Sequence, residues 1–160
     1  MAPIVTGIDI ARPPAEVFSY VSDPSRFGEW QSGIIRGGTE GDGPPAVGAR
    51  CFMVRRIAGA ERTLTSEITE LDPPRTWAMT GVDGPIRATV RVSVEPAAGG
   101  QHSDVTFSLD FSGRGIGKML LPAITGQAAK EARQSCQNLK QRLERAGPGV
   151  QPRTRKDSGS

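Results

Sequence analysis

The clearest pattern in the chain is an alternation of apolar and polar residues in two neighbouring segments. In 86–95 every even-numbered residue is apolar and every odd-numbered residue is polar, and 105–111 repeats the alternation in the opposite phase. A period of two is typical of strands that bury one face and expose the other. The segment between them, 96–100, is rich in glycine, alanine and proline, so we predict an antiparallel hairpin.

Shorter segments of the same kind precede this hairpin, and Gly- and Pro-rich turns bound several of them. Further predicted strands are 4–10, 34–39, 47–57, 62–71 and 75–80. After the first strand, Pro13 and Pro14 suit the first turn of a short helix. Asp23, directly before Pro24, suits the cap of a second short helix that ends near Trp30. The expected order is therefore one strand, two short helices and six more strands.

From Lys118 to Arg145 the period becomes helical. The apolar or small positions that recur every three or four residues are Leu121, Ile124, Ala128, Ala132, Cys136, Leu139 and Leu143. Such a helix is about 42 Å long, and one antiparallel sheet is available to bury its apolar stripe. The fold class is therefore α+β, with the sheet curved around the helix. Small residues in the middle of the helix leave room for a ligand cavity, unless large side chains such as Trp77, Phe107 and Phe111 fill it.

Composition and charge restrict the function classes. Apolar residues make up 36% of the 160 residues, which is too many for a chain disordered throughout. We predict a single domain over 1–146 and a disordered basic tail over 147–160. That tail carries three cations and one anion, so the net charge of +3 falls to +1 without it. A balance so close to neutral does not indicate a nucleic-acid partner.

Several features indicate where the protein resides. No run of 18 apolar residues is present, so stable membrane insertion is not expected. The N-terminus lacks the basic and apolar regions of a signal peptide. Cys51 and Cys136 are therefore expected to be reduced thiols in a cytoplasmic protein.

Few residues suit catalysis. His102 is the only histidine, and it lies in the predicted hairpin turn, the usual place of a solvated side chain. One histidine and two isolated cysteines do not make a metal site. The glycine-rich segment 113–118 lacks the spacing of a phosphate-binding loop, because Met119 follows Lys118. We expect neither a metal nor a nucleotide cofactor, and the catalytic residues, if there are any, are not identifiable.

Four polar residues share the phase of strand positions predicted to point inward. These are Ser66 and Glu70 in one strand and Arg50 and Arg56 in another. Ser66 and Glu70 follow the phase of Ile68, whereas the two arginines follow Phe52 and Val54. At a cavity mouth an arginine or glutamate orients a ligand carbonyl or carboxylate, or serves as the acid in an aldol-type cyclisation. The alternative is that these are ordinary solvated strand ends.

Several segments resemble the SRPBCC/START-like superfamily. They are 8–18 followed by Trp30, 47–50 (Val-Gly-Ala-Arg), 67–75 (Glu-Ile-Thr-Glu-Leu-Asp-Pro-Pro-Arg) and 139–144 (Leu-Lys-Gln-Arg-Leu-Glu). Within the superfamily the chain looks most like bacterial polyketide cyclase/dehydrase and lipid-transport-like proteins. The resemblance covers about residues 3–146. Its motifs belong to the framework and include no catalytic signature.

The resemblance implies a helix-grip fold: a curved antiparallel sheet of about seven strands wrapped around a long C-terminal helix, with a deep apolar cavity between them. Carried onto this sequence, the residues expected to line the cavity and bind the ligand are Phe27, Trp30, Phe52, Val54, Leu64, Ile68, Trp77, Met79, Val90, Val92, Phe107, Leu109, Ile124, Ala128 and Ala132.

Three functions fit these expectations. The first is binding of a hydrophobic small molecule, such as a lipid, a polyketide or an aromatic metabolite. The second is a polyketide cyclase or aromatase-like enzyme that promotes aldol cyclisation and dehydration, with no metal or nucleotide cofactor. The third is a protein-interaction module with a filled core. An antiparallel edge strand also leaves a homodimer open.

Overall fold

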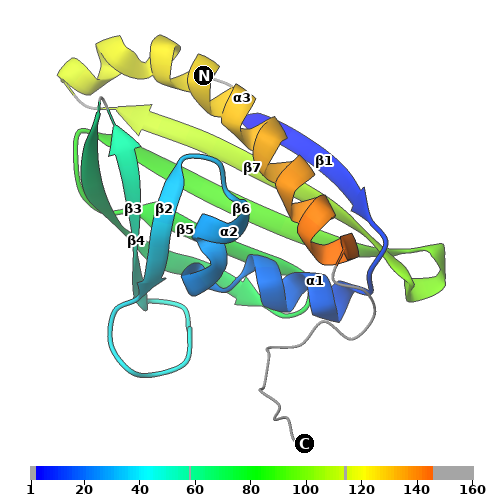
Figure 1. Cartoon of the computed structure of the whole chain (residues 1–160). Coiled ribbons are helices and arrows are strands. Elements are labelled where there is room, and N and C mark those ends of the chain that lie inside the picture. The colour runs from blue at the N-terminus through cyan, green and yellow to red at the C-terminus, as the bar shows by residue number, and fades with distance from the viewer. Residues whose placement is uncertain (1–2, 58, 114, 146–160) are drawn as a thin grey trace, which may run out of the picture.

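The structure is a computed structural model and describes residues 3–57, 59–113 and 115–145. A seven-stranded antiparallel sheet in the order β1-β7-β6-β5-β4-β3-β2 curves around one long helix, α3 (Figure 1). The elements are β1 (Ile4–Ile10), α1 (Pro14–Val21), the 3₁₀ turn η1 (Pro24–Arg26), α2 (Phe27–Trp30), β2 (Ile34–Thr39), β3 (Arg50–Ile57), β4 (Ala60–Asp72), β5 (Thr76–Gly81), β6 (Ile86–Ala97), the 3₁₀ turn η2 (Ala98–Gly100), β7 (His102–Gly113) and α3 (Ile116–Arg145). The predicted α+β helix-grip fold is confirmed. The predicted tail, 147–160, lies outside the described residues.

The ends of the elements follow from local chemistry. Asp23 accepts a hydrogen bond from the Ser25 N–H at 3.0 Å, which caps the turn before α2 as predicted. β3 begins three residues later than predicted, because Gly48 has a φ of +92° and interrupts the extended backbone. Among the described residues, no helix combines the length and the apolarity needed to cross a membrane.

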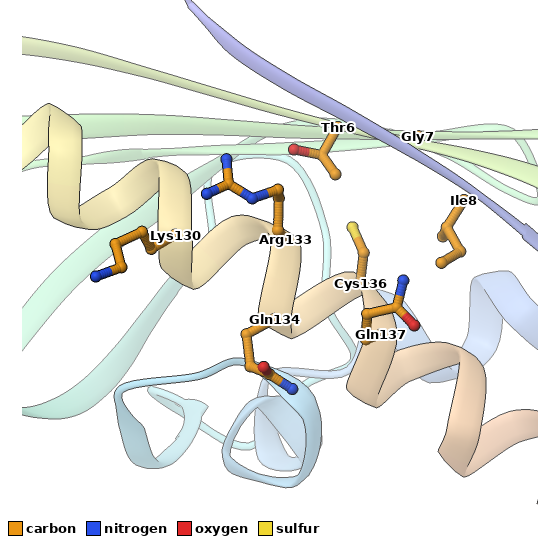
Figure 2. A pocket seen from close by; sticks show the side chains of 8 residues that line it. All are labelled: Thr6, Gly7, Ile8, Lys130, Arg133, Gln134, Cys136 and Gln137. Atoms are coloured by element: carbon orange, nitrogen blue, oxygen red, sulfur yellow. The ribbon is translucent and has the colours of Figure 1, made fainter.

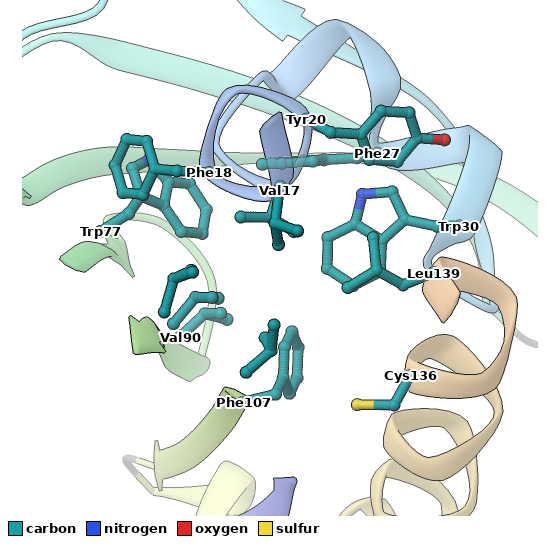
Figure 3. Packing of buried hydrophobic residues seen from close by; sticks show 14 of the residues in the cluster. Val17, Phe18, Tyr20, Phe27, Trp30, Trp77, Val90, Phe107, Cys136 and Leu139 are labelled. Atoms are coloured by element: carbon teal, nitrogen blue, oxygen red, sulfur yellow. The ribbon is translucent and has the colours of Figure 1, made fainter. Parts of the chain in front are cut away.

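The core lies between the sheet and one end of α3. Its centre is a group of aromatic side chains packed edge to face (Figure 3). The ring centroids of Phe27 and Trp77 are 5.5 Å apart, and those of Trp30 and Phe107 are 5.9 Å apart. From α3, Cys136, Leu139 and Leu143 join this cluster. At this end of the fold, large side chains fill the space between sheet and helix.

The register of β3 places one predicted pair of cavity residues on the face opposite to Cys51 and Met53. The Sγ atom of Cys51 lies 3.6 Å from the Sδ atom of Met79, whose side chain belongs to the core. Cys51 and Met53 therefore face the helices, whereas Phe52 and Val54 point to the convex face. All four residues are apolar, so alternation alone does not distinguish the two faces. Val54 is nevertheless buried, with 3% of its surface exposed.

A β-bulge corrects a second prediction. Ile68 pairs with Met79, but Glu70 pairs with Ala78, so one extra residue shifts the phase of β4 between them. Glu70 therefore leaves the inner face. Its carboxylate accepts hydrogen bonds from Thr76 at 2.7 Å and from Arg91 at 3.0 Å. Arg50 and Arg56 lie on the same outer face as Phe52 and are exposed.

Candidate ligand-binding site

The inner face of the sheet changes in size from one register row to the next. One row holds Phe107, Val92 and Trp77, which are large and buried. The next inward row, two residues along each strand, holds Leu109, Val90 and Met79. Four residues along, the equivalent row holds Ala88, Gly81 and Ser66, with Phe111 opposite Ala88. This small-residue row lies toward the end of the sheet where β7 ends and α3 begins (Figure 1). Toward that end the inner face therefore carries small residues on β4, β5 and β6, whereas the aromatic cluster lies toward the other end.

The two halves of α3 meet these two regions. We call 116–127 the N-terminal half and 128–145 the C-terminal half. In the C-terminal half, Ala128, Ala132, Cys136, Leu139 and Leu143 are all buried. On the same stripe of the N-terminal half, Leu121 and Ile124 are only half-buried. Their stripe continues from Gly117, which packs against Ile86 and Pro85, so both residues face the sheet.

A set of apolar side chains on both surfaces is therefore partly accessible to solvent although it faces inward. We call it the half-buried apolar set. Its members are Leu64, Ile86, Ala88, Leu109 and Phe111 from the sheet, and Leu121 and Ile124 from α3. Register pairs connect it: Phe111 lies opposite Ala88 in the β6–β7 ladder. An apolar surface of this kind is stabilised by anything that removes it from water.

An ion pair lies at the side of this region. The Arg55 guanidinium on β3 donates to the Glu131 carboxylate on α3 at 2.6 Å and to the Ser32 carbonyl at 3.3 Å. Gln127 donates to the same carboxylate at 3.2 Å. Gly33 has a φ of +91°, and a Cβ there would lie 2.6 Å from the Arg55 guanidinium. Arg55 shares the inner face with Cys51 and Met53, and it is the cation that the predicted phase of β3 missed.

Other ionisable groups are poorly suited to catalysis. Burial raises the pKa of the Cys51 and Cys136 thiols to about 11, so both are protonated at neutral pH and weak nucleophiles. Burial and the hydrogen bond to Glu29 raise the pKa of Tyr20 further above its ordinary value. His102, at the start of β7, is half-buried, and its Nδ1 lies 3.2 Å from a carboxylate oxygen of Asp9. In the described segments, no three histidine, cysteine or acidic residues come together as metal ligands.

The fifteen predicted cavity residues fall into three groups. Eleven are buried: Phe27, Trp30, Val54, Ile68, Trp77, Met79, Val90, Val92, Phe107, Ala128 and Ala132. Leu64, Leu109 and Ile124 belong to the half-buried apolar set. Phe52 alone, on the convex side of β3, is half-buried outside that set. The prediction omitted Ile86, Ala88, Phe111 and Leu121, although the alternation of the last hairpin and the stripe of the helix contained the signal for them.

Comparisons with known proteins agree with this geometry. Residues 1–144 match the family described as polyketide cyclase/dehydrase and lipid transport. An uncharacterized protein of Mycobacterium tuberculosis (strain ATCC 25618 / H37Rv) is 29% identical over 141 residues, which cover 84% of this chain and 96% of that protein.

Solved structures share the fold at low sequence identity. A START superfamily protein from Mycobacterium smegmatis has a TM-score of 0.73 at 15% identity, covering 92% of this chain and all of that one. The Zhui aromatase/cyclase from Streptomyces sp. R1128 has a TM-score of 0.68 at 16% identity, covering 91% and 98%. The di-domain aromatase/cyclase BexL from the BE-7585A biosynthetic pathway has a TM-score of 0.72 at 18% identity. That match covers 90% of this chain but only 47% of BexL, so this chain spans about half its length.

Proposed function

The chain belongs to the polyketide cyclase/dehydrase and lipid transport family, and from that premise we propose that it binds a hydrophobic small molecule: a lipid, a polyketide or an aromatic metabolite. The observation that supports this proposal is the half-buried apolar set. Its side chains come from β4, β6, β7 and α3, face the same space, and stay in contact with water. A ligand that covers them gains about 25 cal/mol for each Å² of apolar surface removed from water.

The position of the ligand differs from the one expected from sequence. The aromatic cluster occupies the space beneath the C-terminal half of α3. We place the ligand beneath the N-terminal half instead, against Ala88, Phe111 and Ile124. The small residues of that row and the partial exposure of the half-buried apolar set support this position, and the ligand portion in contact with the set is apolar.

A cyclase-like activity is the second candidate, and Arg55 favours it. Its guanidinium lies on the inner face at the side of the proposed ligand position and is 30% exposed. A fixed cation there would stabilise negative charge that develops on a ketone oxygen during an aldol closure. The shape of the site would then orient the reacting chain. Loss of turnover without loss of ligand binding in Arg55→Gln would identify this role.

A filling substitution tests the binding proposal. Ala88→Phe places a large side chain among the half-buried apolar set, whereas Thr89→Phe adds the same side chain at the next position, which is exposed on the opposite face. Each variant and the wild type is titrated with 1-anilinonaphthalene-8-sulfonate. Bound probe is then displaced with a fatty acid and with an aromatic polyketone.

We expect saturable binding that Ala88→Phe weakens roughly tenfold or more, a loss of about 1.4 kcal/mol. Thr89→Phe should stay within about twofold of the wild type, since surface changes are nearly neutral. Absence of saturable binding by all three compounds, or equal binding by Ala88→Phe, would overturn the proposal and favour the interaction module. Circular dichroism of both variants shows whether each is folded before it is compared.

A further inference from the structure

A second site lies away from the proposed ligand position, between the edge strand β1 and α3. It is an open groove of about 520 Å³. Its lining residues are Thr6, Gly7, Ile8, Lys130, Arg133, Gln134, Cys136 and Gln137 (Figure 2). None of them belongs to the half-buried apolar set or to the predicted cavity. Most of its side chains are exposed, so the groove is too open to enclose a small molecule and suits an extended chain.

The main chain of β1 is available along this groove. β1 is the edge of the sheet and pairs only with β7 within the described chain. The Asp9 carbonyl accepts a hydrogen bond from Lys140 Nζ at 2.6 Å, so it points away from β7. Strand geometry repeats every two residues, so the N–H and C=O groups of Gly7 and Val5 point the same way. An edge with such groups is a template for an added strand.

The positive charge of the groove indicates which kind of partner strand would fit beside β1. Lys130 and Arg133 are exposed on the flank of α3, and Figure 2 shows Arg133 extending from the helix toward Thr6. The eight lining residues include no acid. The neighbouring Glu131 carboxylate is bonded to Arg55, and the Asp9 carboxylate lies beside His102. The cations of the groove are therefore not neutralised from within the site.

We propose that this groove binds an extended acidic segment of a partner protein, which adds to β1 as an eighth strand. Side chains alternate between the two faces of a strand. Acidic residues of the partner would therefore face Lys130 and Arg133, and the residues between them would lie beside Val5, which is 62% exposed. Alternating acidic and apolar residues are the expected motif. This proposal is independent of the proposed ligand binding between the sheet and the N-terminal half of α3.

Two other occupants fit the charge less well. A second copy paired through β1 would bring its own Lys130 and Arg133 toward the same groove, because such an interface is self-complementary. The C-terminal segment of this chain contributes Arg153, Arg155 and Lys156, which have the same sign as the groove. An acidic partner is the complementary choice.

The test uses a fluorescein-labelled heptapeptide of alternating Glu and Val, titrated with the whole protein by fluorescence anisotropy. The first control has the same composition with the Glu residues grouped together, and the second has Lys in place of Glu. We expect a Kd on the order of 100 µM for the alternating peptide. The binding should weaken roughly tenfold in a Lys130→Glu and Arg133→Glu double variant. Arg62→Glu, an exposed site on β4, should leave the binding unchanged.

The main-chain contact has its own variant. Gly7→Pro removes an N–H that points away from β7, so the sheet keeps its ladder while the added strand loses a donor. Should Gly7→Pro fail to fold, protection of the Gly7 amide from hydrogen exchange by the peptide replaces it. Absence of binding of the labelled peptide at protein concentrations up to about 1 mM, the range of weak contacts, would overturn the proposal. The proposal would also be overturned if the peptide with grouped Glu residues bound as tightly as the alternating one. A homodimer that the Lys130→Glu and Arg133→Glu double variant disrupts would overturn it too, because the groove would then bind a second copy.

Discussion

The two halves of α3 are one continuous helix with two different surroundings. The C-terminal half buries Leu139 and Leu143 to about 1% exposure in the aromatic core. The N-terminal half exposes Ile116, Met119 and Leu120 to 69%, 79% and 48%. These three residues lie off the sheet-facing stripe, and on the stripe itself Leu121 and Ile124 are only half-buried. The sheet therefore covers the N-terminal half less completely than the C-terminal half.

Polar contacts follow the same division. At the C-terminal half, the Ser32 N–H donates to Ser135 Oγ at 2.8 Å, and Asn138 donates to the Trp30 carbonyl at 3.1 Å. The Ala11 N–H donates to the Glu144 carboxylate at 2.8 Å. In the N-terminal half, Pro122 cannot donate the hydrogen bond of its own helical turn. The comparison teaches that side chains and polar contacts fix the C-terminal half in the core, whereas the N-terminal half is held by fewer of them.

The largest expected effect is on the free energy of unfolding. Leu139→Ala should lower it by about 2–5 kcal/mol, because the deletion leaves a cavity in a packed core. Leu120→Ala removes the same atoms from an exposed position and should change it by less than about 0.5 kcal/mol. Urea denaturation of both variants measures the difference. Similar losses for the two leucines would contradict the division of the helix.

Amide hydrogen exchange should show the next largest effect. Amides of 120–127 should exchange roughly 30-fold faster than those of 132–143, an opening free energy lower by about 2 kcal/mol. The reason is that few buried contacts hold the N-terminal half. Nuclear magnetic resonance resolves the two groups, and a bound hydrophobic ligand should slow only the first. Uniform protection along α3 would refute this prediction.

The Arg55–Glu131 pair lies near the boundary between the halves. A double-mutant cycle with Arg55→Gln and Glu131→Gln should give a coupling energy of about 1 kcal/mol, since both side chains are at most 30% exposed. The matched control is Arg56 with Glu61, which are 61% and 50% exposed at 3.8 Å. Its coupling should be at most about 0.3 kcal/mol. A larger coupling energy for Arg56 and Glu61 than for Arg55 and Glu131 would contradict this prediction.

The smallest effect concerns acid. Hydrogen bonds from Lys140 and from the Ala11 N–H hold the pKa of Glu144 below its ordinary value of 4.5. A carboxylate with a lowered pKa stabilises the fold above the unfolded value, and this contribution is lost as pH falls through the folded value. Glu144→Gln should therefore reduce the loss of stability on acidification below about pH 4.5. Thermal melts of the variant and the wild type between pH 6 and 3 measure this difference, and identical profiles would contradict the prediction.

Most of the fold could be predicted because its strands and its long helix each have one solvent-exposed and one buried face. The alternation in 86–95 and 105–111 and the stripe from Leu121 to Leu143 identify a sheet and a long helix. The same patterns predicted Leu64, Leu109 and Ile124 as inward-facing residues, and the structure places them in the half-buried apolar set. These predictions needed only local periodicity, which a single sequence contains.

The rest depended on contacts between distant residues. Cys51 to Val54 are apolar on both faces, so only pairing with β4 chose the inner one, and only the bulge after Ile68 turned Glu70 outward. Arg55 and Glu131 are 76 positions apart. The edge of β1 became a groove only where α3 lies beside it. Periodicity determines which faces of an element are apolar, whereas register and packing decide which apolar residues are buried and which stay open to a ligand.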